Sequence, residues 1–332
     1  MIAAAPLLST HGLVKHYDLR RGLRRFVAKA GDHTVRALDG VSLEIRKGET
    51  LGVIGESGCG KTTLGRTVLR LHEPTAGRVV FDGQDLAGLD KAALTAMRRR
   101  MQIIFQDPYA SLNPRRTVEQ IVGLGLEIHE RQDAAARRER VARMLDRVGL
   151  PRSHLGRYPH QFSGGQRQRI GIARALVLNP DFVVCDEPVS ALDVSIQAQI
   201  IALLAELKRE LGLTFLFISH DLSVVAHVSD RVVVMYLGQI VEQGAARALL
   251  ASPAHPYTQA LLAAVPRVDA ASRPARLPLT GDLPSPLRPP HGCRFHTRCP
   301  KAMPVCREQA PTVRDVAAGH SVACHLYPEL RA

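Results

Sequence analysis

Between residues 162 and 170 the chain reads Phe162-Ser163-Gly164-Gly165-Gln166-Arg167-Gln168-Arg169-Ile170. Gly164 and Gly165 allow the backbone to approach an anion closely, and Ser163 is suited to cap the Arg-rich helix expected to follow. The first turn of a helix presents backbone N–H groups and the positive end of its dipole. This run therefore predicts an anion-binding site at the start of a helix.

A second phosphate-binding motif lies upstream, at Gly55-Glu56-Ser57-Gly58-Cys59-Gly60-Lys61-Thr62-Thr63. It matches the pattern G-x-x-x-x-G-K-[ST], with an apolar strand expected before it (50–54) and a helix after it (61–71). The glycines let backbone N–H groups surround phosphates, Lys61 neutralises the β/γ oxygens, and the Thr62 hydroxyl is a ligand for Mg²⁺. We interpret Cys59 as a small loop residue rather than a reactive thiol.

An apolar strand at 182–185 delivers Asp186 and Glu187 to its C-terminal end, where the ligands of parallel sheets bind. Asp186 is predicted to hold the Mg²⁺ shell, and Glu187 to orient and deprotonate the attacking water. The alternative is that both carboxylates only cap the next helix.

Taken together, these motifs resemble the ATP-binding cassette (ABC) family over roughly residues 7–244. The resemblance implies an α/β fold: a P-loop ABC ATPase core with a mixed sheet and an inserted helical subdomain at about 114–178. It also implies that two ATP molecules with Mg²⁺ are held between two head-to-tail ATPase domains. Phosphate bound by Lys61 of one chain would then meet Ser163 and Gly165 of the other.

The family pattern adds further site residues by position. Tyr17 corresponds to the residue that stacks on adenine, with a core tyrosine as the alternative. Gln106 corresponds to the glutamine that senses Mg²⁺ and water, Asp193 ends the loop through which the two domains communicate, and His220 contacts the γ-phosphate. The predicted catalytic residues are Glu187, His220, Gln106 and Lys61, and the predicted Mg²⁺ ligands are Thr62, Gln106 and Asp186. The predicted nucleotide-binding residues are Tyr17, Gly55, Glu56, Ser57, Gly58, Cys59, Gly60, Lys61, Thr62, Thr63, Gln106, Asp186, Ser163, Gly164, Gly165, Gln166 and Asp193.

Four segments resemble the ATPase subunits of dipeptide and oligopeptide importers: residues 106–114, 157–160 (Arg-Tyr-Pro-His), 255–258 (His-Pro-Tyr-Thr) and 281–286. This implies a second ABC ATPase subunit as partner, in a homodimer or heterodimer, beneath two membrane permeases fed by an extracytoplasmic solute-binding protein. It places the chain peripherally at the cytoplasmic face of the inner membrane. Nickel or glutathione is the alternative cargo. A soluble ABC ATPase of DNA repair or translation, or a non-catalytic nucleotide-binding subunit, is the alternative function.

The composition changes after residue 250, since 13 of the 21 prolines lie beyond it. Such proline density opposes long helices and central strands, so we expect a nucleotide-binding domain at 1–250 and a loop-rich extension at 251–332. Structural disulfides are improbable in a cytosolic protein. The extension carries four cysteines, Cys293, Cys299, Cys306 and Cys324, whose convergence suggests a metal centre. Four thiolates suit a [4Fe–4S] cluster, which some family members carry in this extension; zinc or free cysteines are the alternatives.

The net charge of +13 raises the possibility of nucleic-acid binding, but the chain has no Trp and only 4% aromatic residues on which bases could stack. We therefore expect no nucleic-acid partner. The basic cluster at residues 20–29 suits anionic lipid headgroups, and solvated arginines on helix faces are the alternative. There is no run of eighteen apolar residues and no secretory signal pattern.

Overall fold

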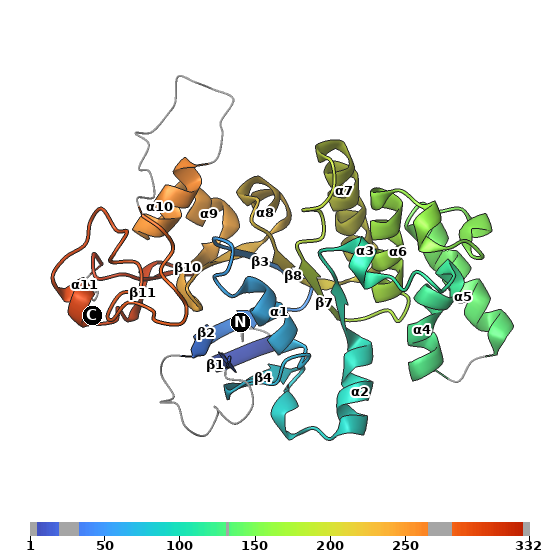
Figure 1. Cartoon of the computed structure of the whole chain (residues 1–332), viewed down its shortest axis with the longest axis horizontal. Helices are drawn as coiled ribbons and strands as arrows, with labels where there is room; N and C mark the ends of the chain where they lie inside the picture. Colours follow the sequence, from blue (N-terminus) through green and yellow to red (C-terminus); the bar gives the residue numbers. More distant parts are fainter. Residues whose placement is uncertain (1–4, 20–32, 131–132, 265–280, 328–332) are drawn as a thin grey trace. The chain divides into compact units, whose positions relative to one another are not determined.

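The computed structural model describes residues 5–19, 33–130, 133–264 and 281–327, so the basic cluster at 20–29 lies outside the described residues. The chain divides into two compact units (Figure 1). The first is built mainly from Asp85–Ser219, and the second from Leu8–Glu44, Leu51–Gln84 and the chain after His220. Each is described by itself below.

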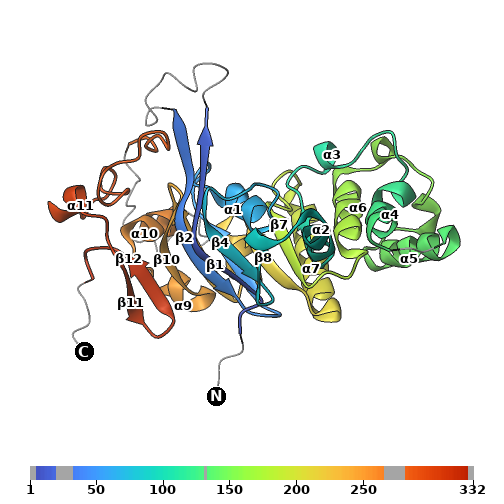
Figure 2. The same ribbon diagram turned by 90° about the horizontal axis from the view of Figure 1, so that it is seen from below.

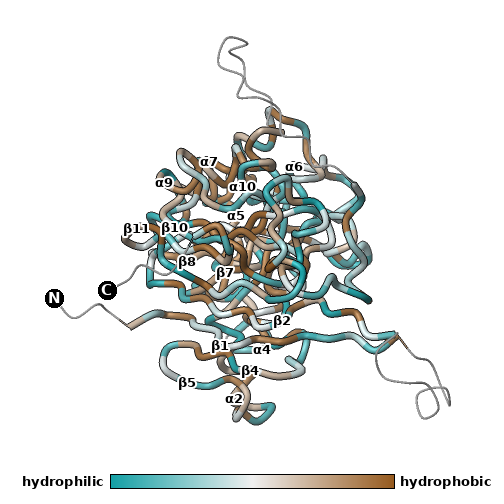
Figure 3. Tube along the Cα trace, turned by 90° about the vertical axis from the view of Figure 1, so that its left-hand side faces the viewer, coloured by the Kyte–Doolittle hydropathy of each residue, from teal (hydrophilic) through white to brown (hydrophobic). Residues whose placement is uncertain are grey.

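The first unit contains three parallel strands in the order β8-β7-β6. They are β6 (Met101–Ile104), β7 (Phe182–Asp186) and β8 (Thr214–Ile218), with Cys185 opposite Phe217 in the register. Every residue of β7 and β8 is buried, and all except Thr214 and Asp186 are hydrophobic (Figure 3). Continuous apolar runs are typical of parallel strands covered on both faces, and the predicted strands at these positions are confirmed.

Helices make up the rest of this unit. They are α2 (Lys91–Arg100), α3 (Pro108–Ser111), α4 (Val118–His129), α5 (Ala134–Arg147), α6 (Gly164–Leu176) and α7 (Val194–Leu211), with 3₁₀ turns at Leu86–Gly88, Arg152–His154 and Pro159–Gln161. Helices α4, α5 and α6 pack together as the predicted helical subdomain (Figure 1). Helix α4 begins with a complete capping box between Thr117 and Gln120, which satisfies two backbone N–H groups at its start.

The second unit holds strands in the order β11-β12-β10-β9-β3. Strand β3 (Thr50–Ile54) runs parallel to β9 (Arg231–Tyr236), which forms the predicted hairpin with β10 (Gln239–Ala245) through Leu237 and Gly238. This sheet is therefore mixed, as predicted. A separate antiparallel layer has the order β2-β1-β4, from β1 (Leu8–Asp18), β2 (Thr34–Ile45) and β4 (Ala76–Phe81); β5 (Gln84–Asp85) follows (Figure 2).

The helices of the second unit are short. They are α1 (Lys61–Val68), α8 (Leu222–Val228), α9 (Ala246–Ala251), α10 (Pro256–Ala263) and α11 (Val305–Glu308). Helix α1 ends three residues before the predicted Leu71, and Arg70 then adopts a left-handed φ of 49° that breaks the helix. Among the described residues, no helix combines the length and the apolar character needed to cross a membrane.

The Pro- and Cys-rich end is more ordered than its composition suggested. Strand β12 (His320–Ala323) pairs antiparallel with β10, and β11 (Val313–Ala317) pairs with β12. The buried carboxylate of Glu242 on β10 accepts hydrogen bonds from the backbone N–H groups of Ala254 and His255, and lies 2.7 Å from the His320 ring. The extension is thus attached to the sheet by strand pairing and a buried polar network.

Candidate nucleotide-binding and catalytic site

The phosphate loop joins β3 to α1, and two of its glycines are required by close backbone contacts. A Cβ atom at Gly55 would lie 2.3 Å from the Met235 carbonyl oxygen, and one at Gly60 would lie 2.3 Å from the Ala37 carbonyl oxygen. Gly60 also adopts a left-handed conformation, with φ at 107°, immediately before the helix. Because Gly60 has no side chain to cap α1, the first-turn N–H groups are directed at whatever anion the loop receives. The loop fits the phosphates of a nucleotide.

Lys61 supplies the cation of this loop. Its side chain is only 5% exposed, and its ammonium donates to the carbonyl oxygens of Gly55 (2.7 Å) and Glu56 (3.0 Å). The charge is thus held at the centre of the loop. Thr62 and Thr63 follow it on the first turn of α1 and are partly exposed.

Cys59 is fully buried within the loop, and burial raises the pKa of its thiol, although the nearby Lys61 opposes the shift. A neutral buried thiol agrees with the interpretation of Cys59 as a small structural residue. The Cys59 carbonyl accepts a hydrogen bond from the Gly238 N–H (2.9 Å), which ties the loop to the β9–β10 hairpin.

In the first unit, the structure brings Gln106 and Glu187 together. The Gln106 side-chain amide donates to the Glu187 carboxylate at 2.8 Å, and Asp186 lies beside them at the end of β7, only 1% exposed. Glu187 has a left-handed φ of 47°, a conformation that costs a non-glycine residue roughly 1–2 kcal/mol. Its backbone is held there by hydrogen bonds to Ile218 (3.0 Å) and Ser190 (3.3 Å). A strained backbone persists only where the surrounding contacts enforce it, and such residues are common at active sites.

Gln106 and Asp186 of the first unit and Thr62 of the second each carry an oxygen donor of the kind that Mg²⁺ prefers. A hard cation takes hydroxyl, carboxylate and amide oxygens, and each of the three side chains offers one.

Ser163 is the N-cap of α6, as predicted. Its hydroxyl accepts from the Gln166 N–H at 3.3 Å, and the Gln166 side-chain oxygen accepts from the Ser163 N–H at 3.1 Å. This capping box uses two of the backbone N–H groups that the sequence suggested were open to an anion. The Gln166 side chain would have to leave this capping box in order to make its predicted contact with a nucleotide.

Gly165 has a packing role that the sequence did not reveal. A Cβ atom there would lie 2.7 Å from the Ile196 Cγ2 atom on α7, whereas one at Gly164 would make an ordinary 3.4 Å contact with Leu192. Helix α6 therefore approaches α7 closely at Gly165. Asp193 is the N-cap residue of α7 and is exposed.

Two further predicted residues lie in the second unit. Tyr17, on β1, is only partly buried; its ring packs edge-on to His72 at 5.8 Å, with the Lys15 ammonium 4.9 Å from its centre. The ring is thus neither fully buried nor free of neighbours, and its stacking on adenine stays a prediction. His220 directly follows Ser219 at the end of β8 and is exposed.

The four C-terminal cysteines are free, and three of them are less than 10% exposed. The pKa of the Cys293 thiol is raised to about 11, mainly by burial; a backbone hydrogen bond from Phe295 opposes the shift, and the thiols of Cys306, Cys324 and Cys299 contribute to it. The four thiols therefore lie within one another's electrostatic reach. Across the residues that the structure describes, however, no group of three or more His, Cys, Asp or Glu side chains is arranged to hold a metal ion.

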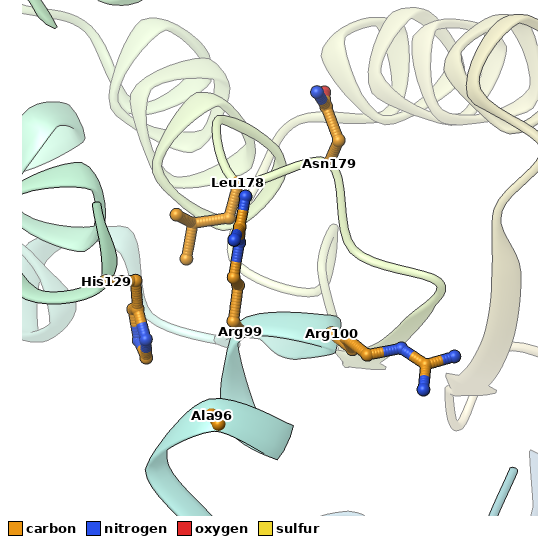
Figure 4. A pocket seen from close by; sticks show the side chains of 6 residues that line it. All are labelled: Ala96, Arg99, Arg100, His129, Leu178 and Asn179. Carbon is orange, nitrogen blue, oxygen red and sulfur yellow. The ribbon is translucent and has the colours of Figure 1, made fainter. Parts of the chain in front are cut away.

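A cavity of about 470 Å³ in the first unit is separate from these motifs (Figure 4). Two of its arginines have carboxylate partners, Arg99 with Glu130 at 2.7 Å and Arg100 with Asp181 at 2.5 Å. None of its lining residues belongs to the predicted site; they are Ala96, Arg99, Arg100, His129, Leu178 and Asn179.

The family is settled by comparison with known proteins. The model described as ABC transporter matches residues 38–190, and that described as Oligopeptide/dipeptide transporter, C-terminal region, matches residues 241–306. The chain is 54% identical over 324 residues to the oligopeptide transport ATP-binding protein AppF of Bacillus subtilis (strain 168), covering 97% of each chain. The chain belongs to the ABC transporter family, as an ATP-binding protein of its oligopeptide/dipeptide branch. The resemblance stated from the sequence is confirmed.

Other relatives agree. This ABC ATPase is 50% identical to the dipeptide transport ATP-binding protein DppF of Haemophilus influenzae, over 96% of each chain. Among solved structures, cbiO1 from Clostridium perfringens, part of the ABC transporter complex cbiONQ, has a TM-score of 0.63 and 29% identity, covering 75% of this chain and 92% of cbiO1. The ATP-binding cassette MJ0796, in a dimeric post-hydrolysis state bound to ADP and Pi, has a TM-score of 0.63 and 31% identity, covering 72% and 99%.

Sequence reasoning missed one group beside the phosphate loop of this ABC ATPase. The buried Arg298 side chain pairs with both carboxylate oxygens of Glu56, at 2.6 and 3.0 Å. The Tyr257 hydroxyl accepts the Glu56 N–H at 2.8 Å. In the sequence, Arg298 is marked only by its position between two cysteines. Its partner Glu56 is 242 residues away, so no periodic pattern connects the two residues.

Proposed function

We propose that Glu187 activates the water that attacks ATP, in a reaction that drives import of di- or oligopeptides through membrane subunits. ATP hydrolysis coupled to transport is the activity of the family to which the chain belongs. The observation that supports Glu187 is its strained backbone together with its 2.8 Å hydrogen bond from Gln106. This bond orients the carboxylate of Glu187, which would accept a proton from the water.

The remaining residues have binding roles in this proposal. The phosphate loop and Lys61 would hold the triphosphate of ATP, and Thr62, Asp186 and Gln106 would hold Mg²⁺, which would supply neutralisation of phosphate charge. Tyr17 stacks on adenine and His220 contacts the γ-phosphate. Ser163 and Gly165 face the nucleotide of a second ATPase subunit, which is consistent with the dimeric state of the MJ0796 cassette.

The peptide cargo is supported by the match of residues 241–306 to the oligopeptide/dipeptide C-terminal region and by the name of AppF. The partners in this proposal are a second ABC ATPase, two permeases at whose cytoplasmic face the chain sits, and an extracytoplasmic binding protein. Tyr109 is 60% exposed in the segment 106–114 and is stacked by the Arg167 guanidinium at 4.0 Å, which suits a surface that contacts a permease.

The substitution Glu187→Gln tests the catalytic assignment. It keeps the shape of the side chain and its ability to meet Gln106, but removes the base, so we expect ATP turnover to fall about 10²–10⁴-fold while ATP binding persists. Glu206→Gln, at an exposed carboxylate on α7, is the matched control and should hydrolyse ATP normally. Unchanged turnover in Glu187→Gln would remove Glu187 from the catalytic role.

As a separate proposal, the four C-terminal thiols bind a [4Fe–4S] cluster with a structural role. Their mutual electrostatic influence supports this, as do backbone hydrogen bonds to the sulfurs of Cys293, Cys299 and Cys324, which tune such clusters. The thiols as placed form no ligand set among the described residues, so loading would require them to move closer together. Anaerobic purification followed by iron, sulfide and zinc analysis tests it. Colourless protein without iron would refute the cluster. Zinc bound in stoichiometric amount would show that the four thiols form a zinc site instead.

A further inference from the structure

The loop between Cys293 and Cys299 reaches the phosphate loop within the second unit. Its Phe295 is 1% exposed and packs against the rings of Tyr236 (5.3 Å) and Tyr257 (5.4 Å). These rings form an apolar base from which Arg298 extends to Glu56.

Glu56, the second residue of the phosphate loop, is held at every polar group that it has. Its N–H donates to the Tyr257 hydroxyl, its carbonyl accepts from the Lys61 ammonium, and its carboxylate is paired with Arg298. The pair is bidentate, and the guanidinium is the more buried partner, with 6% of its side chain exposed against 24% for Glu56. A planar guanidinium matches a carboxylate in this way and fixes its direction as well as its charge.

A second arginine of the same loop holds the other side of the phosphate loop. Arg294 donates to the Asp39 carboxylate and to the Leu237 carbonyl. Leu237 precedes Gly238, whose N–H donates to the Cys59 carbonyl. Arg298 therefore contacts the loop directly at Glu56, whereas Arg294 is linked to its backbone through Leu237 and Gly238.

We propose that Arg298 is a positioning residue for nucleotide binding, which fixes and neutralises Glu56 so that the affinity of the phosphate loop for ATP is set by the C-terminal region. An unneutralised carboxylate on this loop would repel the anionic triphosphate. The proposal rests on the proposed function, since it assumes that the loop binds ATP.

The charge argument predicts a specific pattern of affinities. Arg298→Gln should raise the Kd for ATP about tenfold, which equals about 1.4 kcal/mol, with little change in kcat. Glu56→Gln removes the carboxylate charge, so adding Arg298→Gln to this variant should weaken ATP binding far less than Arg298→Gln does in the original protein. The double variant Arg298→Gln/Glu56→Gln should recover most of the affinity, and Arg298→Lys part of it.

The experiment is titration of the full-length protein with a fluorescent ATP analogue, paired with steady-state ATPase kinetics and circular dichroism to check folding. Arg314→Gln is the matched control, because Arg314 lies in the same region and donates to the Tyr327 carbonyl, away from the phosphate loop. If Arg298→Gln folds and binds ATP like the control, the proposal is refuted. If the double variant binds as poorly as Arg298→Gln, the role is only structural. Absence of ATP binding in the original protein would instead refute the proposed function.

Discussion

The close approach of α6 to α7 at Gly165 gives a prediction whose size follows from the structure. Gly165→Ala would place a Cβ atom 2.7 Å from the Ile196 Cγ2 atom, well inside ordinary van der Waals contact. Overpacking of this kind costs about 1–3 kcal/mol, and the better helix propensity of alanine offsets up to about 1 kcal/mol of it. We therefore expect a net loss of about 1 kcal/mol, or about 2–4 °C in Tm for a unit of this size.

The matched control is Gly164→Ala, whose Cβ atom would meet Leu192 at an ordinary 3.4 Å. It should not lower the Tm. Ile196→Ala removes the obstructing methyl group and should cost about 1–2 kcal/mol alone, because Ile196 is only half-buried. The loss of unfolding free energy in the double variant Gly165→Ala/Ile196→Ala should then be about 1–3 kcal/mol smaller than the sum of the losses in the two single variants.

Thermal unfolding followed by circular dichroism, together with ATPase assays, separates two roles of Gly165. If the residue also faces the nucleotide of a second subunit, the double variant should recover stability while its ATP turnover stays low. Full recovery of turnover would show that Gly165 serves packing alone. Additive effects of the two substitutions on stability would refute the steric reasoning itself.

Two other buried groups give sharp expectations. Burial lowers the pKa of His255 to about 3, whereas it is about 6.5 in the unfolded chain. As the pH drops, the unfolded chain therefore takes up the proton first. The free energy of unfolding should fall between pH 6.5 and pH 3, by up to about 1.4 kcal/mol per pH unit. His255→Asn retains a helix-capping acceptor but does not titrate, so it should flatten this acid limb of a Tm–pH curve; an unchanged limb would assign the acid sensitivity to other groups. The Glu242 carboxylate accepts from Ala254 and His255 and lies against His320. Glu242→Gln replaces one of its two oxygens with an NH2 group, which cannot accept a hydrogen bond, and should lower the free energy of unfolding in urea by about 3 kcal/mol. The exposed Glu308→Gln is its control, and equal loss in both variants would contradict the buried-network argument.

Local patterns predicted much of the fold. The strands at 50–54, 182–186 and 214–218 are short apolar runs buried along their whole length, and the phosphate loop follows a motif whose spacing is fixed by close backbone contacts. The helix cap at Ser163 could also be predicted from the sequence, because its partner Gln166 lies only three residues away. Information of this kind is contained within a few consecutive residues.

The side-chain pairs that the sequence did not predict join distant residues. Glu56 meets Arg298, Asp39 meets Arg294 and Glu242 meets His320, and none of these pairs shares an element or a periodicity. The extension also looked like a loop-rich appendage because its prolines oppose regular structure, yet the proline-free residues 313–323 form two strands. Composition averaged over eighty residues conceals such a short segment.

The pairing of β12 with β10 has a consequence for solubility. A sheet edge presents unpaired N–H and C=O groups to other chains, and natural proteins protect such edges with charge or cover. Here β12 covers β10, and the edge passes to β11, whose five residues include Arg314 and Asp315.

A fragment ending near residue 250 would therefore differ from the full chain in more than length. It would expose the edge of β10 and leave the Glu242 carboxylate without its donors from Ala254, His255 and His320. We expect such a fragment to self-associate through β10. We therefore expect the C-terminal strands to protect the sheet edge at β10 from aggregation, whether or not the chain binds a metal or nucleotide.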